Sequence, residues 1–82
     1  MEVEISSYAL QMPIAEFEIV NNDPIIEFTN TSERATTNHW DFGNGETSDE
    51  VNPVYTYPQD GIYNVVLTAE NEYGTDEFEM EI

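Results

Sequence analysis

The chain has no cysteine, almost no basic residues and no long apolar run, and each absence removes a class of function. Without cysteine there are no disulfides, no thiolate nucleophile and no zinc site built on thiolates. Arg34 is the only lysine or arginine against 18 acidic residues, which gives a formal net charge of −17 at pH 7. This charge repels phosphate backbones and anionic membranes, so we expect neither a nucleic-acid nor a membrane partner, and a monomer when the domain is isolated.

Two further absences concern membrane segments and helices. No apolar run is long enough to cross a bilayer, and no basic start is followed by an apolar stretch, so the sequence predicts neither an anchor nor a signal peptide. Apolar residues do not recur at helical spacing over ten positions. With 82 residues, the chain is sufficient for one small domain with a modest core.

Short runs of alternating apolar and polar residues do recur, and they are typical of half-buried β-strands. Turn-forming stretches such as Asn21-Asn22-Asp23-Pro24 separate the runs, and we expect the two strands on either side of that turn to pair or to neighbour each other. Six or seven short strands predict an all-β, antiparallel, immunoglobulin-like β-sandwich over residues 13–82. The expected strands are residues 15–19, 26–31, 37–42, 54–57, 62–70 and 77–82, and residues 46–52 are expected to be an acidic loop. Residues 1–12, in which Val3 and Ile5 alternate with glutamates, are either a linker or an extra edge strand.

The central run is His39-Trp40-Asp41-Phe42-Gly43-Asn44-Gly45. On an extended strand Trp40 and Phe42 point to one face, which we assign to the core, and Asp41 points to the other. Glycine and asparagine tolerate left-handed backbone angles, so the strand is expected to end at Gly43 in a tight turn.

Several motifs in this order resemble the PKD domain, whose hallmark is a tryptophan-aspartate-phenylalanine-glycine-aspartate-glycine run. Asn44 stands here where the second aspartate is usual. The resemblance implies a non-catalytic spacer or protein-interaction and adhesion module within a larger cell-surface or secreted protein, and hence an extracellular location. Its alternative implication is an accessory domain that holds a polysaccharide or protein substrate for a neighbouring hydrolase. The matching segments are Trp40–Gly45, Thr47-Ser48, Asn52-Pro53, Tyr55–Tyr57, Gly61–Thr68 and Asn71–Gly74.

A second local pattern supports an immunoglobulin-like arrangement. Tyr63 precedes Val65 with the spacing of a tyrosine corner, in which the tyrosine hydroxyl bonds back to the backbone near the start of the sixth strand. Val65 then occupies the position of the usual disulfide cysteine. We therefore expect Trp40 to be buried against apolar side chains such as Phe28 and Val65.

Candidate chemistry is sparse, and we predict no catalytic, cofactor-binding or metal-binding residues. Asp41 is interpreted as accepting bonds from the backbone of the turn that comes after it, with a metal-ligand role as the alternative. His39 is the sole histidine and is expected to be exposed, because it lacks the partners of a triad or a zinc site. The carboxylates between residues 46 and 50 lie in a predicted exposed loop, which does not suit paired acid-base catalysis.

Three weaker signals remain open. Calcium favours oxygen ligands, and two stretches supply them, Asn21-Asn22-Asp23 and Glu70-Asn71-Glu72 with Asp76, although diffuse attraction of cations by the net charge explains the same composition. Tyr55 and Tyr73 could stack on a sugar, because Tyr57 and Tyr63 are assigned to the core and to the corner. The run Asn30-Thr31-Ser32 matches a glycosylation acceptor, a pattern that is common by chance.

The last expected strand has one charged and one apolar face. Glutamates at 77, 79 and 81 alternate with Phe78, Met80 and Ile82. Repeated like charges discourage an edge strand from pairing with another copy, so we expect this strand to lie at a sheet edge and to be protected at neutral pH.

Overall fold

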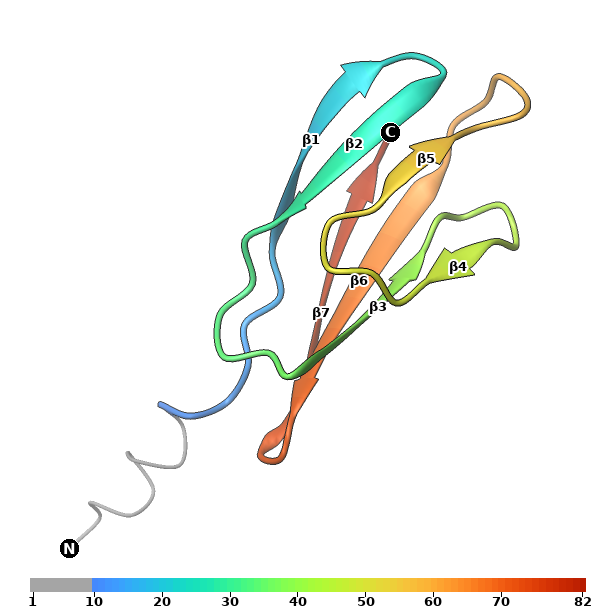
Figure 1. Cartoon of the computed structure of the whole chain (residues 1–82). Helices are drawn as coiled ribbons and strands as arrows, with labels where there is room; N and C mark the ends of the chain where they lie inside the picture. The colour runs from blue at the N-terminus through green and yellow to red at the C-terminus, as the bar shows by residue number, and fades with distance from the viewer. Residues whose placement is uncertain (1–9) are drawn as a thin grey trace, which may run out of the picture.

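The computed structural model describes residues 10–82, and within that range the secondary structure consists of β-strands without a helix (Figure 1). The expected edge strand around Val3 to Ile5 lies outside the described residues, and residues 10–12 form a turn and a bend. In the part of the chain described here, no helix has the length and apolarity needed to span a bilayer. The strands are β1 (Phe17–Asn22), β2 (Ile25–Asn30), β3 (Thr37–Asp41), β4 (Thr47–Ser48), β5 (Val54–Thr56), β6 (Asn64–Asn71) and β7 (Gly74–Glu81).

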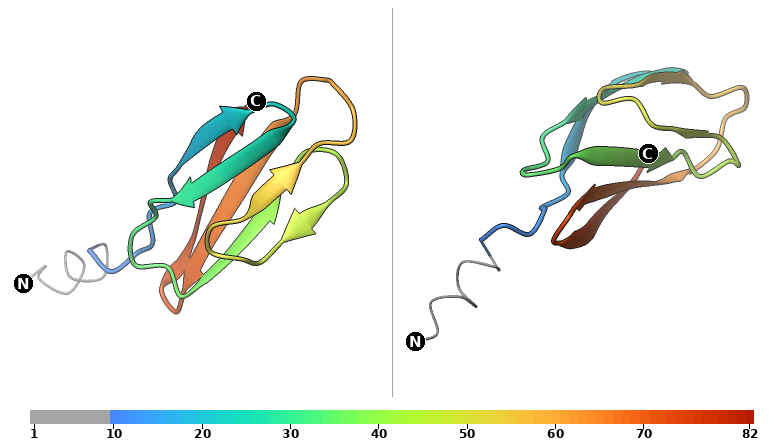
Figure 2. Two further views of the ribbon diagram at one scale, coloured as in Figure 1. Left: turned by 45° about the horizontal axis from the view of Figure 1, so that its top comes forward. Right: turned by 60° about the horizontal axis from the view of Figure 1, so that its bottom comes forward.

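The strands form two antiparallel sheets, which Figure 2 shows as two layers. One sheet has the order β1-β2-β5 and the other β4-β3-β6-β7. The predicted sandwich is therefore confirmed. The expected pairing of the first two strands is also confirmed, with Phe17 opposite Asn30 and Asn22 opposite Ile25.

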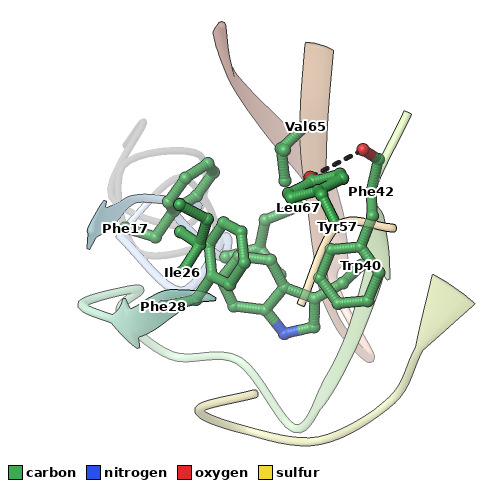
Figure 3. Close-up of a cluster of buried hydrophobic side chains, with 8 residues drawn as sticks. All are labelled: Phe17, Ile26, Phe28, Trp40, Phe42, Tyr57, Val65 and Leu67. Atoms are coloured by element: carbon green, nitrogen blue, oxygen red, sulfur yellow. Dashed lines mark hydrogen bonds between the residues drawn. The ribbon is translucent and has the colours of Figure 1, made fainter. Parts of the chain in front are cut away.

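The core lies between the sheets because each strand alternates its side chains between the two faces. In β6, Val65, Leu67 and Ala69 are buried, while the residues between them are half-buried and face outward. In β7 the same alternation leaves Phe78 and Met80 packed against the core and the glutamates exposed. The buried cluster drawn in Figure 3 contains Phe17, Ile26, Phe28, Trp40, Phe42, Tyr57, Val65 and Leu67.

The strand boundaries differ from the predicted ones by one to three residues at most strand ends; for example, β1 runs on to Asn22 and β7 begins at Gly74. The stretch predicted as an acidic loop contains the two-residue strand β4, in which Ser48 pairs with Trp40 and Thr47 with Asp41. The sixth strand begins at Asn64 and not at Ile62, because the preceding segment is shaped by the tyrosine corner described below. The predicted turn before β2 is shorter than expected, because Asn21 and Asn22 belong to β1 and the turn consists of Asp23 and Pro24, which are joined by a cis peptide bond.

Residues 10–16, here called the lead, approach the sandwich at the β6–β7 hairpin. The side chain of Asn71 donates to the carbonyl of Gln11 at 2.8 Å, and Arg34 Nε donates to the carbonyl of Met12 at 2.9 Å. The amide of Ala15 donates to Asp76 Oδ2 at 2.8 Å. The lead therefore starts at the Gly74 end of β7, whereas the last residue, Ile82, lies at the other end, where its amide donates to the carbonyl of Tyr63 at 2.8 Å.

Candidate functional site

Trp40 is fully buried, as predicted, and lies at the centre of the inter-sheet contacts. Its ring centroid is 5.0 Å from that of Phe17 and 5.2 Å from that of Phe28. The contact with Phe28 was expected, whereas that with Phe17 depends on how β1 crosses the other sheet. The indole N–H donates to the carbonyl of Glu50 at 2.8 Å, so the one polar atom of the side chain is satisfied.

The turn after Phe42 has the backbone geometry that the sequence predicts. Gly43 and Gly45 have φ angles of 85° and 97°, in the left-handed region that favours glycine. A Cβ atom at Gly43 would lie 2.6 Å from the backbone oxygen of Asn64, so this position also requires close packing against β6. Asp41 Oδ1 accepts from the amide of Gly43 at 2.9 Å. The interpretation of Asp41 as a turn-capping residue is confirmed by this bond.

Four aromatic rings form a continuous row that connects the two sheets. Phe42 stacks on Tyr55 with centroids 4.3 Å apart, Tyr55 meets Tyr57 edge-on at 4.8 Å, and Tyr57 stacks on Tyr63 at 4.2 Å. One face of Tyr55 is thus covered by Phe42, and its hydroxyl accepts a hydrogen bond from the side-chain amide of Asn44 at 2.9 Å. This corrects the interpretation of Tyr55 as a free stacking surface, because the ring is needed to pack the end of β3.

The hydroxyl groups of the last two rings in the row are both used as donors. Tyr63 Oη donates to the carbonyl of Gln59 at 2.7 Å, which confirms the predicted tyrosine corner. Tyr57 Oη donates to the carbonyl of Phe42 at 2.8 Å in the buried core (Figure 3). Burial, with smaller contributions from Tyr55, Tyr63 and Asp41, raises the pKa of Tyr57 to about 12. The Tyr57–Phe42 bond was not predicted, since nothing in the local sequence indicates which carbonyl lies opposite the hydroxyl.

His39 is exposed, as expected, and its Nδ1 lies 2.9 Å from Asp49 Oδ1. Both groups are exposed on the solvent side of the four-stranded sheet, where they line an open hollow together with Val51 and Thr68. Within residues 10–82, no group of three or more histidine, cysteine, aspartate or glutamate side chains is arranged to hold a metal ion.

In each of the two stretches considered for calcium, one or two side-chain oxygens accept internal hydrogen bonds. Asn21 Oδ1 accepts from the amide of Asp23 at 2.9 Å. Asn71 Oδ1 accepts from the amide of Tyr73 at 2.7 Å, and Asp76 accepts from the lead. In both stretches, oxygens that could have bound a cation therefore serve to close turns or to attach the lead.

The two other candidate sites were a sugar-stacking pair, Tyr55 and Tyr73, and a glycosylation acceptor, Asn30. Tyr55 contacts Asn44, beyond the C-terminal end of β3, whereas Tyr73 follows β6, whose Glu70 pairs with the first residue of β3. The two tyrosines thus lie at opposite ends of β3 and cannot form one sugar-stacking strip. The side-chain amide of Asn30 donates to Asn38 Oδ1 at 2.9 Å, so the predicted acceptor nitrogen is used within the fold.

The outer faces of the two sheets differ in character. On the four-stranded sheet each of two cross-strand rows contains a carboxylate, with Asp41, Val66 and Glu79 in one row and His39, Thr68 and Glu77 in the next. On the three-stranded sheet, Val20 and Val54 flank Glu27 and are 50% and 63% exposed. The four-stranded sheet therefore carries the more acidic face.

Comparison with known proteins agrees with this architecture. The family model described as the PKD domain matches residues 11–82. A segment of 66 residues is 38% identical to the pre-pro-metalloprotease PrtV of Vibrio cholerae. The segment covers 76% of this chain and 7% of that protein. A second segment, of 37 residues, is 49% identical to collagenase ColQ1 of Bacillus cereus. This segment covers 45% of this chain and 4% of that protein. The chain thus spans less than a tenth of the length of these curated relatives.

Two solved structures are similar over almost their full length. The PKD1 domain of Vibrio anguillarum Epp matches with a TM-score of 0.80 and 32% identity, over 88% of this chain and 92% of that one. The PKD1 domain of Vibrio cholerae PrtV matches with a TM-score of 0.79 and 35% identity, over 85% of this chain and 93% of that one. By its sequence, its two-sheet topology and these matches, the chain belongs to the PKD domain family.

Proposed function

We propose that this chain is a non-catalytic spacer module of a larger extracellular protein, whose immediate partners are adjacent domains of the same polypeptide. The observation that carries the proposal is where the first and the last described residues lie on the sandwich. The lead docks at the Gly74 end of β7, and Ile82 lies at the opposite end beside Tyr63. β7 has eight residues and is roughly 27 Å long. A module with this geometry holds its two neighbouring domains about one strand length apart.

The chemistry of the described residues supports a passive role. The indole N–H of Trp40 donates to a main-chain carbonyl, and the carboxylate of Asp41 closes the turn after β3. The hydroxyls of Tyr57 and Tyr63 also donate to main-chain carbonyls. Residues used in this way hold the sandwich together. They are not free to bind a substrate without a loss of stability.

A second candidate is an accessory domain that binds a polysaccharide or protein substrate for a neighbouring hydrolase. It is favoured by the names of the relatives, a metalloprotease and a collagenase, in each of which the matching segment is a small fraction of the whole. The same position in a larger enzyme would suit either a spacer or a substrate-holding module.

Retention of the purified chain on insoluble collagen, chitin and cellulose separates the two functions. A spacer is expected to remain in the supernatant at physiological ionic strength. Saturable retention on one polymer, competed by its soluble fragments, would replace the spacer with the substrate-holding module. Turnover of generic esterase, glycosidase or peptidase substrates by the chain itself would contradict both.

A further inference from the structure

β7 forms one edge of the four-stranded sheet, and the direction of its backbone groups follows from its pairing with β6. The amide of Ile82 donates to the carbonyl of Tyr63, and these two residues come directly after the last ladder pair, Asn64 and Glu81, so they continue the same register. Hydrogen-bonded pairs alternate along an antiparallel ladder, so Met80 and Phe78 also direct their amides and carbonyls toward β6. The intervening residues, Glu81, Glu79 and Glu77, must direct theirs away from it.

These outward-directed groups have no backbone partner within residues 10–82. The strand lies at the border of its sheet, and no backbone hydrogen bond joins that edge of β7 to another described segment. Among the described residues, the lead meets β7 at Asp76, through a side-chain bond, and at Gly74, against which the side chain of Met12 lies. The stretch from Glu77 to Glu81 therefore offers three residues whose amides and carbonyls can pair with a further strand.

The same three residues place their carboxylates on one face. Glu77, Glu79 and Glu81 are exposed and alternate with the inward-facing Phe78 and Met80. A strand added to this edge would place alternate side chains directly beside the three glutamates, because directly opposite residues in a ladder share a face. Backbone pairing and charge thus specify the same positions of the incoming strand.

We propose that the edge of β7 from Glu77 to Glu81 is a docking surface for an extended polypeptide with lysine or arginine at alternate positions. The added strand continues the four-stranded sheet, and its cationic side chains lie beside the glutamates. This mode combines main-chain hydrogen bonds, which supply affinity, with alternate side chains, which supply specificity. It is independent of whether the chain acts as a spacer or holds a substrate.

Charge complementarity also disfavours pairing of this edge with a second copy of the chain. Two β7 edges brought together would oppose glutamate to glutamate, which is destabilising. Within residues 10–82 the single basic residue, Arg34, is on the lead side of the molecule, bonded to Met12 and Glu33. The edge therefore distinguishes a cationic strand from the protein's own strands.

The direct test uses a fluorescent nine-residue peptide with lysine at every second position and threonine or valine between. Its control is a peptide of identical composition with the lysines grouped at one end. Binding to the full 82-residue chain is measured by fluorescence anisotropy at pH 7, and the contact site by amide chemical shifts. The alternating peptide is expected to bind about tenfold more tightly than the grouped one, the effect of three cross-strand charge pairs of ordinary strength.

Two matched triple variants separate the edge from the overall charge. Glu77→Gln, Glu79→Gln and Glu81→Gln together should weaken binding of the alternating peptide by about tenfold. Glu16→Gln, Glu18→Gln and Glu27→Gln together change the net charge equally, from −17 to −14, but on or beside strands of the other sheet. This control should leave the affinity nearly unchanged.

Backbone pairing is tested separately. Glu79→Pro removes an outward amide without breaking the ladder to β6, and N-methylation of alternate peptide residues removes the donors on the other side without touching the protein. Each change is expected to abolish the difference in affinity between the alternating and the grouped peptide. When the unmodified alternating peptide binds the wild-type chain, only amides near residues 75–81 should shift. The proposal is overturned if the grouped peptide binds equally well, if both triple variants weaken binding equally, or if N-methylation has no effect.

Discussion

Replacing Tyr57 by phenylalanine removes one oxygen atom and leaves the carbonyl of Phe42 without a partner. The hydroxyl donates to that carbonyl at 2.8 Å in the buried core, and the ring itself can keep its contacts with Tyr55 and Tyr63. A buried acceptor left unsatisfied costs about 1–3 kcal/mol. For a domain of this size, that corresponds to a fall in melting temperature of roughly 5–20 °C.

The matched control is Tyr63→Phe, which loses a bond of nearly the same length. The carbonyl of Gln59 is exposed and can bind water after the substitution, so a loss of only about 0.5–1 kcal/mol is expected. Urea unfolding monitored by the emission of Trp40 measures both variants. The reasoning is refuted if Tyr57→Phe costs no more than Tyr63→Phe.

The stability difference between the wild type and Tyr57→Phe should also depend on pH. Because the pKa of Tyr57 rises from 10.0 to about 12 in the folded state, folding favours the protonated hydroxyl. Its contribution to stability is complete below pH 10 and is lost as the pH rises toward 12. The difference in unfolding free energy between the wild type and Tyr57→Phe should therefore narrow across that interval. A constant difference from about pH 8 to 12 would contradict a raised pKa.

Four further outcomes are expected. Trp40→Ala should cost about 3–5 kcal/mol and leave the domain mostly unfolded, and the wild-type protein should show the emission of a buried indole. Gly45→Ala should cost about 1–2 kcal/mol for its positive φ alone, and Gly43→Ala should cost more, because its Cβ would also meet the backbone of β6. Sodium and calcium chloride at equal ionic strength should raise the melting temperature equally; a calcium-specific gain that Asp76→Ala abolishes would show a bound ion. Light scattering should report a monomer at about pH 7 and association near pH 4, because protonation removes the repulsion at the sheet edge, and Glu79→Lys should alter that association.

The sequence predicted the elements whose side chains alternate. Trp40 and Phe42 could be assigned to the core because a two-residue period is a local property of a strand. The tyrosine corner and the capping of Gly43 by Asp41 were also predictable, since each joins residues close together in the chain. The edge position of the last strand followed from its repeated glutamates, and it is confirmed by the sheet order.

The features that escaped prediction depend on how the two sheets pack. β4 has only two residues and no periodicity, and it exists because it pairs with Trp40 and Asp41. Asp76 was considered as a calcium ligand, but it binds the amide of Ala15, 61 positions away in the chain. Tyr55 was left for a ligand because no local pattern indicates that Phe42 covers its ring. Each of these contacts becomes visible only when strands distant in sequence are placed side by side.

The attachment of the lead implies an order of local opening. The lead is held by side chains that bind the carbonyls of Gln11 and Met12 and the amide of Ala15, and by one isolated backbone bridge between Ile14 and Glu33, whereas the sandwich is held by buried rings and strand ladders. Segments with few buried contacts open with a smaller free energy than the global unfolding of a domain. In native-state hydrogen exchange, the amide of Ala15 should therefore lose protection well before those of Val65 and Leu67. Among the described residues, the lead is then the segment that separates from the sandwich first.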